Sequence, residues 1–228
     1  HYIEGRIQLA QHALDNKRPV DALNHVFTAL ESHEKNKFTG SIDLADTYRL
    51  QGKIQLKMAL YEDAQNSLKL SLEKRPQSAR SWHLLAQAQL HTESYSEAEK
   101  SVRSAMDIRT IPSMQADLGV ALVSQGQIKA GQSLISEALQ DQAIGNFLRH
   151  AAFGKSLLKQ HKFAAAQPHL EKALTFKESA NTRADLAYVM WKLGNQEAAF
   201  ENLSIAMQLD EEENEYVNEI SRQINGPQ

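Results

Sequence analysis

The chain has 228 residues, of which 42% are hydrophobic and 23% are charged, and its formal net charge is −3. This length allows one large or two small domains, and the composition is that of a folded protein rather than a disordered one. A charge so close to neutral provides no general attraction to nucleic acid or to an anionic membrane. We therefore expect no nucleic-acid partner.

The sequence contains no cysteine, so disulfides, thiolate metal sites and cysteine nucleophiles are excluded. The longest purely apolar run, residues 118–123, is far too short to span a bilayer, and no signal peptide is visible. We therefore expect no direct membrane insertion. A chain without thiols suits the cytoplasm and the periplasm alike, so the localisation stays open between them.

The chain opens with a short segment that has two interpretations. Residues 3–6 read Ile-Glu-Gly-Arg, which is also a protease site often placed behind purification tags. We interpret the segment as native, because Ile3 falls where apolar residues recur in later parts of the chain; the alternative is a remnant of a vector. We also expect the chain to be a part of a longer protein whose targeting information is lost.

From this point the chain divides into six similar units, which we interpret as one domain spanning residues 1–228. The units begin at spacings of 42, 34, 33, 35 and 33 residues. Their predicted ranges are near 3–44, 45–78, 79–111, 112–146, 147–179 and 180–211.

Small residues recur at three positions of every unit. Helices approach one another closely only where the side chains in contact are small, so this recurrence predicts repeated helix pairs. A branched apolar residue stands at a fourth recurring position: Val26, Leu68, Val102, Ile135, Leu170 and Leu203. The eighth, twentieth and twenty-seventh positions are Ala10, Gly52, Ala86, Gly119, Gly154, Ala187; Ala22, Ala64, Ala98, Gly131, Ala166, Ala199; and Ala29, Ser71, Ala105, Ala138, Ala173, Ala206.

Each unit holds two runs of about 14 residues with the apolar spacing of a helix. Breaks between the runs are visible at residues 16–19, 124–127 and 193–196, and nothing in the chain has the pattern of a strand. The first unit is longer by eight residues around 32–41, which predicts either a lengthened second helix or an extended loop. After the sixth unit, Val217, Ile220 and Ile224 share one face, which predicts a capping helix at about 212–224.

These features resemble the tetratricopeptide repeat, whose pattern has an aromatic residue at position 4, Leu-Gly at 7–8, Tyr at 11 and small or apolar residues at 20, 24 and 27. The fourth position departs from the pattern at Arg6, Gln115, His150 and Arg183. The resemblance implies an all-α fold, a right-handed superhelical solenoid of antiparallel helix pairs. The third unit matches best, with Trp82, Leu85, Ala86, Tyr95, Ala98, Val102 and Ala105.

By this resemblance, the first helix of each unit lines a concave groove that binds a peptide. Units two and three present basic residues there, units four and five an apolar floor with lysines, and unit six an aromatic pair. Such a surface suits a partner with acidic residues at one end and an apolar anchor at the other. Packing is an equal alternative for Val120, and solvated charge for the basic residues. The candidate residues are Arg49, Lys53, Arg80, His83, Gln87, Val120, Lys155, Tyr188 and Trp191.

Signals for catalysis are weak. Gly154-Lys155-Ser156 resembles the end of a phosphate-binding loop, but Arg149 stands where that motif needs glycine, and no strand precedes it. Ser156 and Lys159 match a Ser-x-x-Lys pair without its companion motifs. None of the nine histidines is paired at a spacing of three or four residues. We therefore predict no catalytic residue, no metal and no cofactor.

We predict a non-catalytic protein–protein interaction scaffold that binds a peptide or partner protein in the concave groove. By resemblance to bacterial relatives, it is an adaptor in secretion, pilus, polysaccharide-export or envelope machinery. The alternative is a self-associating module that forms homo-oligomers, because exposed Tyr188 and Trp191 would form an apolar patch.

Overall fold

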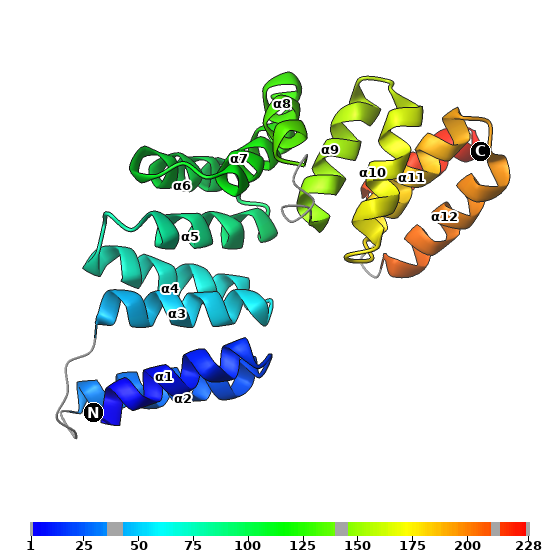
Figure 1. The fold of residues 1–228 in the computed structure, drawn as a ribbon. Coiled ribbons are helices and arrows are strands. Elements are labelled where there is room, and N and C mark those ends of the chain that lie inside the picture. The colour runs from blue at the N-terminus through cyan, green and yellow to red at the C-terminus, as the bar shows by residue number, and fades with distance from the viewer. Residues whose placement is uncertain (1, 36–42, 140–145, 211–214, 227–228) are drawn as a thin grey trace. The chain divides into compact units, whose positions relative to one another are not determined.

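A computed structural model describes residues 2–35, 43–139, 146–210 and 215–226. These residues contain thirteen α-helices and no strand, so the all-α prediction is confirmed (Figure 1). From α1 to α6 and from α8 to α13, consecutive helices pack against one another. The helices are α1 (Tyr2–Asp15), α2 (Pro19–Glu34), α3 (Leu44–Lys57), α4 (Tyr61–Lys74), α5 (Ala79–His91), α6 (Tyr95–Ile108), α7 (Pro112–Ser124), α8 (Ile128–Ala138), α9 (Phe147–Lys159), α10 (Phe163–Leu174), α11 (Ala180–Lys192), α12 (Gln196–Leu209) and α13 (Glu215–Asn225).

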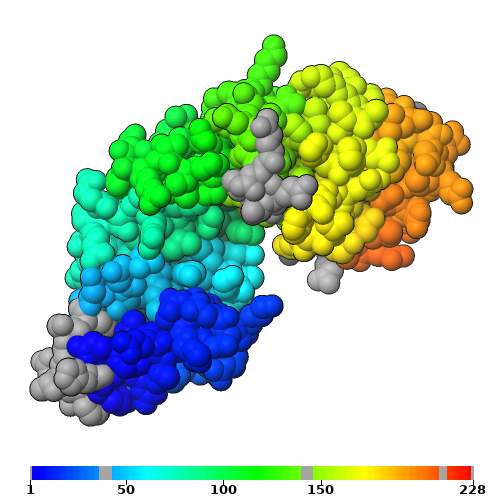
Figure 2. All heavy atoms as spheres, in the orientation of Figure 1, coloured from blue at the N-terminus to red at the C-terminus, as the bar shows by residue number. Residues whose placement is uncertain are grey.

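The chain forms two compact units, His1–Met114 and Gln115–Gln228. The first unit contains α1 to α6, and the second contains α8 to α13. Helix α7 begins in the first unit and continues into the second. Within each unit, side chains fill the spaces that the ribbon leaves open between successive helices (Figure 2).

All eighteen of the small residues that recur in the sequence are buried. Their role is clearest at the glycines, where an added Cβ would collide with the partner helix. A Cβ on Gly52 would lie 2.5 Å from Leu68 Cγ, and one on Gly154 would lie 2.7 Å from Leu170 Cγ. In both helix pairs, therefore, the small residue of the first helix makes room for the branched residue of the second.

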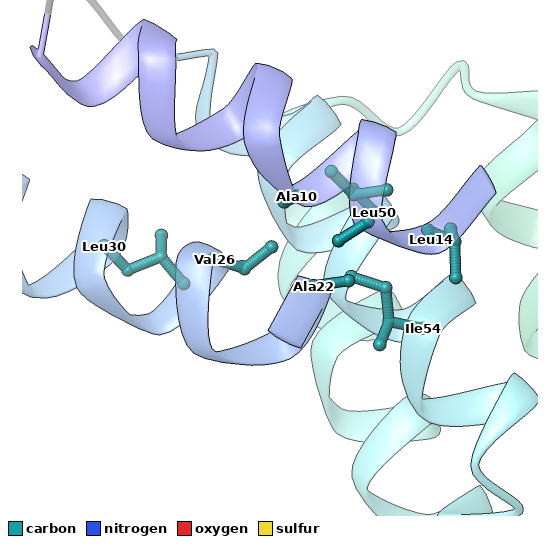
Figure 3. Packing of buried hydrophobic residues seen from close by; sticks show 8 residues of the cluster. Ala10, Leu14, Ala22, Val26, Leu30, Leu50 and Ile54 are labelled. Carbon is teal, nitrogen blue, oxygen red and sulfur yellow. The ribbon is translucent and has the colours of Figure 1, made fainter. Parts of the chain in front are cut away.

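The core of the first unit shows how this packing continues from one pair to the next. Ala10, Leu14, Ala22 and Val26 of α1 and α2 pack in one cluster with α3 (Figure 3). Leu50 and Ile54 of α3 fill the space that the alanines leave (Figure 3). The first helix pair thus buries its next face against the first helix of the following pair.

A left-handed residue lies in the turn within every helix pair. The structure adds three such turns, near residues 59, 93 and 161, to the three that the sequence indicated. At Ala59, the turn is closed by the amide of Leu60, which donates to the carbonyl of Gln55 at 2.9 Å. The six residues with positive φ are Lys17, Ala59, Glu93, Gly126, His161 and Gly194.

Two predicted segments meet the limits of the described residues. Helix α2 ends at Glu34. Residues 36–42, which belong to the extra length of the first repeat, lie outside the described residues. At the other end, α13 buries Val217, Ile220 and Ile224 against α11 and α12. The face predicted for the capping helix is therefore a packed face.

Candidate peptide-binding surface

In the first compact unit, residues 1–114, an acidic neighbour holds the side chain of the basic candidate Arg49. Its Nε and Nη2 atoms donate to Oδ1 of Asp46 at 3.1 and 2.8 Å. Arg75 approaches the other oxygen of the same carboxylate at 3.3 Å. Burial opposes ionisation of Asp46, but the two guanidinium groups outweigh it and lower the pKa of this carboxyl. The charge of Arg49 is thus largely compensated within the chain.

The other four candidates of the first unit lie on the same faces of α3 and α5, two helices that contact one another. Among the described residues, no ion pair involves Lys53 or Arg80, and Arg80 is exposed. Nε2 of His83 lies 3.4 Å from Nε2 of Gln87. Of the three basic candidates in this compact unit, Lys53 and Arg80 are therefore more available to a ligand than Arg49.

In the second unit, aromatic rings and lysines come together on α9, α11 and α13. The ring centroids of Tyr188 and Trp191 are 5.8 Å apart. Nζ of Lys192 lies 4.3 Å from the centroid of Trp191 and 5.2 Å from that of Tyr188. Nζ of Lys155 lies 4.7 Å above the ring of Tyr216. Lys155, Tyr188, Trp191, Lys192 and Tyr216 form what we call the aromatic–lysine cluster.

Tyr216 is a member that the sequence interpretation missed. Arg183 stands at the fourth position of the sixth repeat, and Tyr216 follows it by 33 residues, which is one repeat length. Tyr216 therefore occupies a position where the repeat pattern has an aromatic residue. Its hydroxyl donates a hydrogen bond to Oδ1 of Asp185, which is buried on α11. Burial raises the pKa of Asp185, while Lys155 and Lys159 act against this shift. Burial and the neighbouring carboxylate also raise the pKa of Tyr216.

The remaining candidate, Val120, is buried at 2% exposure in α7. Near it, Arg149 forms an ion pair with Asp117, and both side chains are almost completely buried. Arg149 Nε and Nη2 donate to Asp117 Oδ1 at 3.0 and 2.7 Å. Gly154 lies inside α9, so its role is helix packing rather than phosphate binding.

Two histidines that are 19 residues apart in the sequence meet between α9 and α10. Nδ1 of His150 and Nδ1 of His169 are 3.4 Å apart, and Phe153 contacts the ring of His169 edge-on. Burial lowers the pKa of both histidines, and for His150 the nearby His169 and Lys172 lower it further. In the described part of the chain, no group of three or more His, Asp or Glu side chains could hold a metal ion.

None of the helices in the described ranges is both long and apolar enough to cross a membrane.

The stacked helix pairs define an α-helical repeat protein. Residues 49–109 match the tetratricopeptide repeat family, so this segment consists of tetratricopeptide repeats, and the resemblance seen in the sequence is confirmed. No curated protein matches the chain in sequence.

Solved structures share this fold over nearly the whole chain. The structure of Pseudomonas aeruginosa pilF is 14% identical, with 97% of each chain covered and a TM-score of 0.67. PilW, a type IV pilus biogenesis factor, is 17% identical, with 96% of this chain and 98% of PilW covered and a TM-score of 0.63. YrrB, a tetratricopeptide repeat protein with an unusual peptide-binding site, is 17% identical over 85% of this chain and 97% of its own, with a TM-score of 0.50.

Proposed function

We propose that the chain is a non-catalytic scaffold that binds a peptide or partner protein on the concave side formed by its first helices, as an adaptor in a bacterial assembly such as a pilus, secretion or envelope machine. The fold it shares with pilF and PilW supports this class of function, and the peptide-binding site named for YrrB supports a peptide as the kind of ligand.

The aromatic–lysine cluster is the observation that carries this proposal. Tyr188, Trp191 and Tyr216 are only half-buried, so they offer aromatic surface to a ligand. Lys155 and Lys192 lie over these rings with their charges still able to attract a carboxylate. An apolar anchor next to an acidic residue is the peptide chemistry that such a surface recognises. The nearby buried carboxyl of Asp185 is already bonded to Tyr216 and supports the cluster from within.

The test is capture of partners from an extract of the source bacterium on the immobilised chain, followed by mass spectrometry. We expect a specific protein to be retained by the wild type and lost with Trp191→Ala. Phe200→Ala on α12 is the control, because it also removes an exposed aromatic ring and should keep the partner. The proposal fails if no protein is captured and the pure chain instead turns over a small molecule.

Self-association is the second candidate function, and the half-exposed pair Tyr188 and Trp191 favours it. Light scattering over a range of concentrations distinguishes it from the first. A mass that rises with concentration in the wild type, and not in Trp191→Ala, would support it. A strict monomer at all concentrations would exclude it.

A further inference from the structure

The first compact unit has two grooves at equivalent places in successive repeats. The first has walls from α2 and α4, a floor from α3 and a volume of about 640 Å³. The second has walls from α4 and α6, a floor from α5 and a volume of about 610 Å³. We call them the Phe27 groove and the Trp82 groove. The Phe27 groove is lined by Phe27, Leu30, Glu31, Glu34, Tyr48, Gln51, Gln55, Asp63, Asn66, Ser67 and Leu70.

The two grooves have similar floors but different walls. Tyr48 of the first floor is equivalent to Trp82 of the second, 34 residues later. On the walls, Leu70 is equivalent to Ser104, and Phe27, 42 residues earlier, to Lys69. Phe27 is 48% exposed and Leu70 is 39% exposed. The Phe27 groove therefore presents large apolar side chains from both walls where the Trp82 groove presents polar ones.

The charges of the two grooves also differ. Among the described residues that line the Phe27 groove there are three carboxylates, Glu31, Glu34 and Asp63, and no lysine or arginine. The Trp82 groove is balanced, with Lys69 and Lys100 next to two glutamates. Glu31 pairs with Lys35, but among the described residues no cation pairs with Glu34 or Asp63. The Phe27 groove is thus negative as well as apolar.

The position of Glu34 increases this negative potential. Glu34 is the last residue of α2, and Glu31 lies one turn earlier. A helix C-terminus carries a partial negative charge and favours cations; Lys35, the C-cap residue, already pairs with Glu31, which leaves Glu34 as the carboxylate there that a further positive group can approach. A lysine or arginine of a partner would supply that group.

This groove is distinct from the surface proposed above for peptide binding. Tyr48, Gln51 and Gln55 follow a spacing of three and four residues, so they share one face of α3. Arg49 and Lys53 lie one and two residues away from these positions, which places them on the opposite face of the same helix. One unit can therefore hold two partners on opposite sides.

We propose that the Phe27 groove binds an amphipathic helix of a protein partner. The apolar side chains of that helix pack between Phe27 and Leu70, and its lysines or arginines pair with Glu34 and Asp63. Two neighbouring helices with apolar residues on their facing sides form the groove into which a third helix packs. The charge of the groove selects a basic helix over an acidic one.

The test uses two fluorescent peptides of about 18 residues, a length at which an isolated helix can form. Both have leucines on one face; one carries lysines on the other face and the second carries glutamates. Anisotropy titration of the full chain should show binding of the lysine peptide and at least about tenfold weaker binding of the glutamate peptide. Failure of the lysine peptide to bind the wild type would overturn the proposal.

Two matched pairs of variants locate the binding. Phe27→Ser should weaken the lysine peptide by about tenfold or more, as for an apolar anchor, while Phe200→Ser removes an equally exposed ring from α12 and should have no effect. Asp63→Lys should weaken it about two- to fivefold and reduce its salt dependence.

Glu62→Lys is the control for the charge, because Glu62 is next to Asp63 in the first turn of α4 but does not line the groove. It changes the net charge by the same amount and meets the same helix dipole. Equal effects of the two lysine substitutions, or of the two serine substitutions, would show general attraction of a basic peptide instead of a site. Thermal unfolding of each variant confirms that it is folded.

Discussion

Two buried aspartates at equivalent places in the second compact unit accept hydrogen bonds from different kinds of donor. Asp117 on α7 accepts a hydrogen bond from α9, the first helix of the next repeat, and Asp185 on α11 accepts one from the capping helix α13. The donors lie 32 and 31 positions later in the sequence. For Asp117 the donor is the guanidinium of Arg149, whereas for Asp185 it is the hydroxyl of Tyr216. The contact between α7 and α9, which we call the first joint, is therefore an ion pair. The contact between α11 and α13, the second joint, depends on a neutral donor.

The difference shows how the chemistry of a joint determines its response to pH. A guanidinium with two hydrogen bonds to one carboxylate compensates the buried charge of Asp117 directly. Tyr216 cannot do this for Asp185, and burial raises the pKa of that carboxyl. The first joint should be strong but intolerant of the loss of one partner, and the second weaker and sensitive to pH.

The largest expected effect is at the ion pair. Arg149→Met removes the guanidinium that pairs with the buried carboxylate of Asp117, and should lower the free energy of unfolding by about 3–5 kcal/mol in urea titrations. The double variant Arg149→Met with Asp117→Leu removes the stranded charge and should recover most of the loss. A single variant as stable as wild type, or a double variant no better than the single, would contradict this assignment.

Loss of the hydrogen bond between Tyr216 and Asp185 should lower the free energy of unfolding by a smaller amount. Tyr216→Phe removes the donor to Asp185 and should cost about 1–3 kcal/mol at neutral pH, because the buried acceptor loses its hydrogen bond. The cost is limited because burial already raises the pKa of the Asp185 carboxyl, which makes it easier to protonate. Tyr61→Phe, on a half-buried tyrosine stacked on His91, is the control and should change stability by less than about 0.5 kcal/mol.

The pH dependence of Asp185 sharpens the comparison further. Its pKa is higher in the folded chain than in the unfolded chain, so the unfolded chain releases the proton first and wild-type stability falls as pH rises through that interval. Asp185→Asn keeps an acceptor for Tyr216 but cannot titrate. The stability of the variant relative to wild type should therefore increase between pH 4 and 7, by about 1.4 kcal/mol for each tenfold change in the acid constant. A difference that is independent of pH would refute the raised pKa.

The histidine pair between α9 and α10 should give the smallest effect, in the opposite direction. The pKa of both His150 and His169 is lowered in the folded chain, so stability is lost as pH falls below the unfolded value of about 6.5. Replacing both with Gln should reduce this acid loss by less than about 1 kcal/mol, because both rings are partly exposed to solvent. The free energy of unfolding is measured between pH 7 and 5 for the wild type, for the histidine variant and for Asp185→Asn. The comparison separates the contribution of the histidine pair from that of Asp185.

The parts of the structure that the sequence predicted are those built from short-range, repeated contacts. Gly52 and Leu68 meet within one helix pair, and the same pairing recurs along the chain, so periodicity alone reveals it. The partners of Asp117 and Asp185 are different residue types, Arg149 and Tyr216, so the recurrence of small residues does not reveal either contact. His150 and His169 are 19 residues apart and meet only because α9 and α10 pack together.

The candidate surface was predicted only in part for a similar reason. Repeat positions identified Lys155, Tyr188 and Trp191, but could not show that Asp46 would compensate Arg49. The repeat pattern did not predict the Phe27 groove, because the surface that the pattern indicates lies on the first helices, whereas the walls of this groove come from second helices. Large apolar residues on the exposed side of second helices, such as Phe27 and Leu70, were the available signal.

The facing small residues of each helix pair also determine the distance between its two helices, and each methyl group that they carry increases that distance. Gly119 and Gly131 contribute no methyl group, and a Cβ on either would lie within 2.7 Å of the other's carbonyl oxygen. Gly52 with Ala64, and Gly154 with Ala166, contribute one; the remaining three pairs are Ala with Ala and contribute two. Because helices separate as contact side chains grow, the pitch of such an array can drift through single Gly–Ala exchanges while the rest of the core stays unchanged.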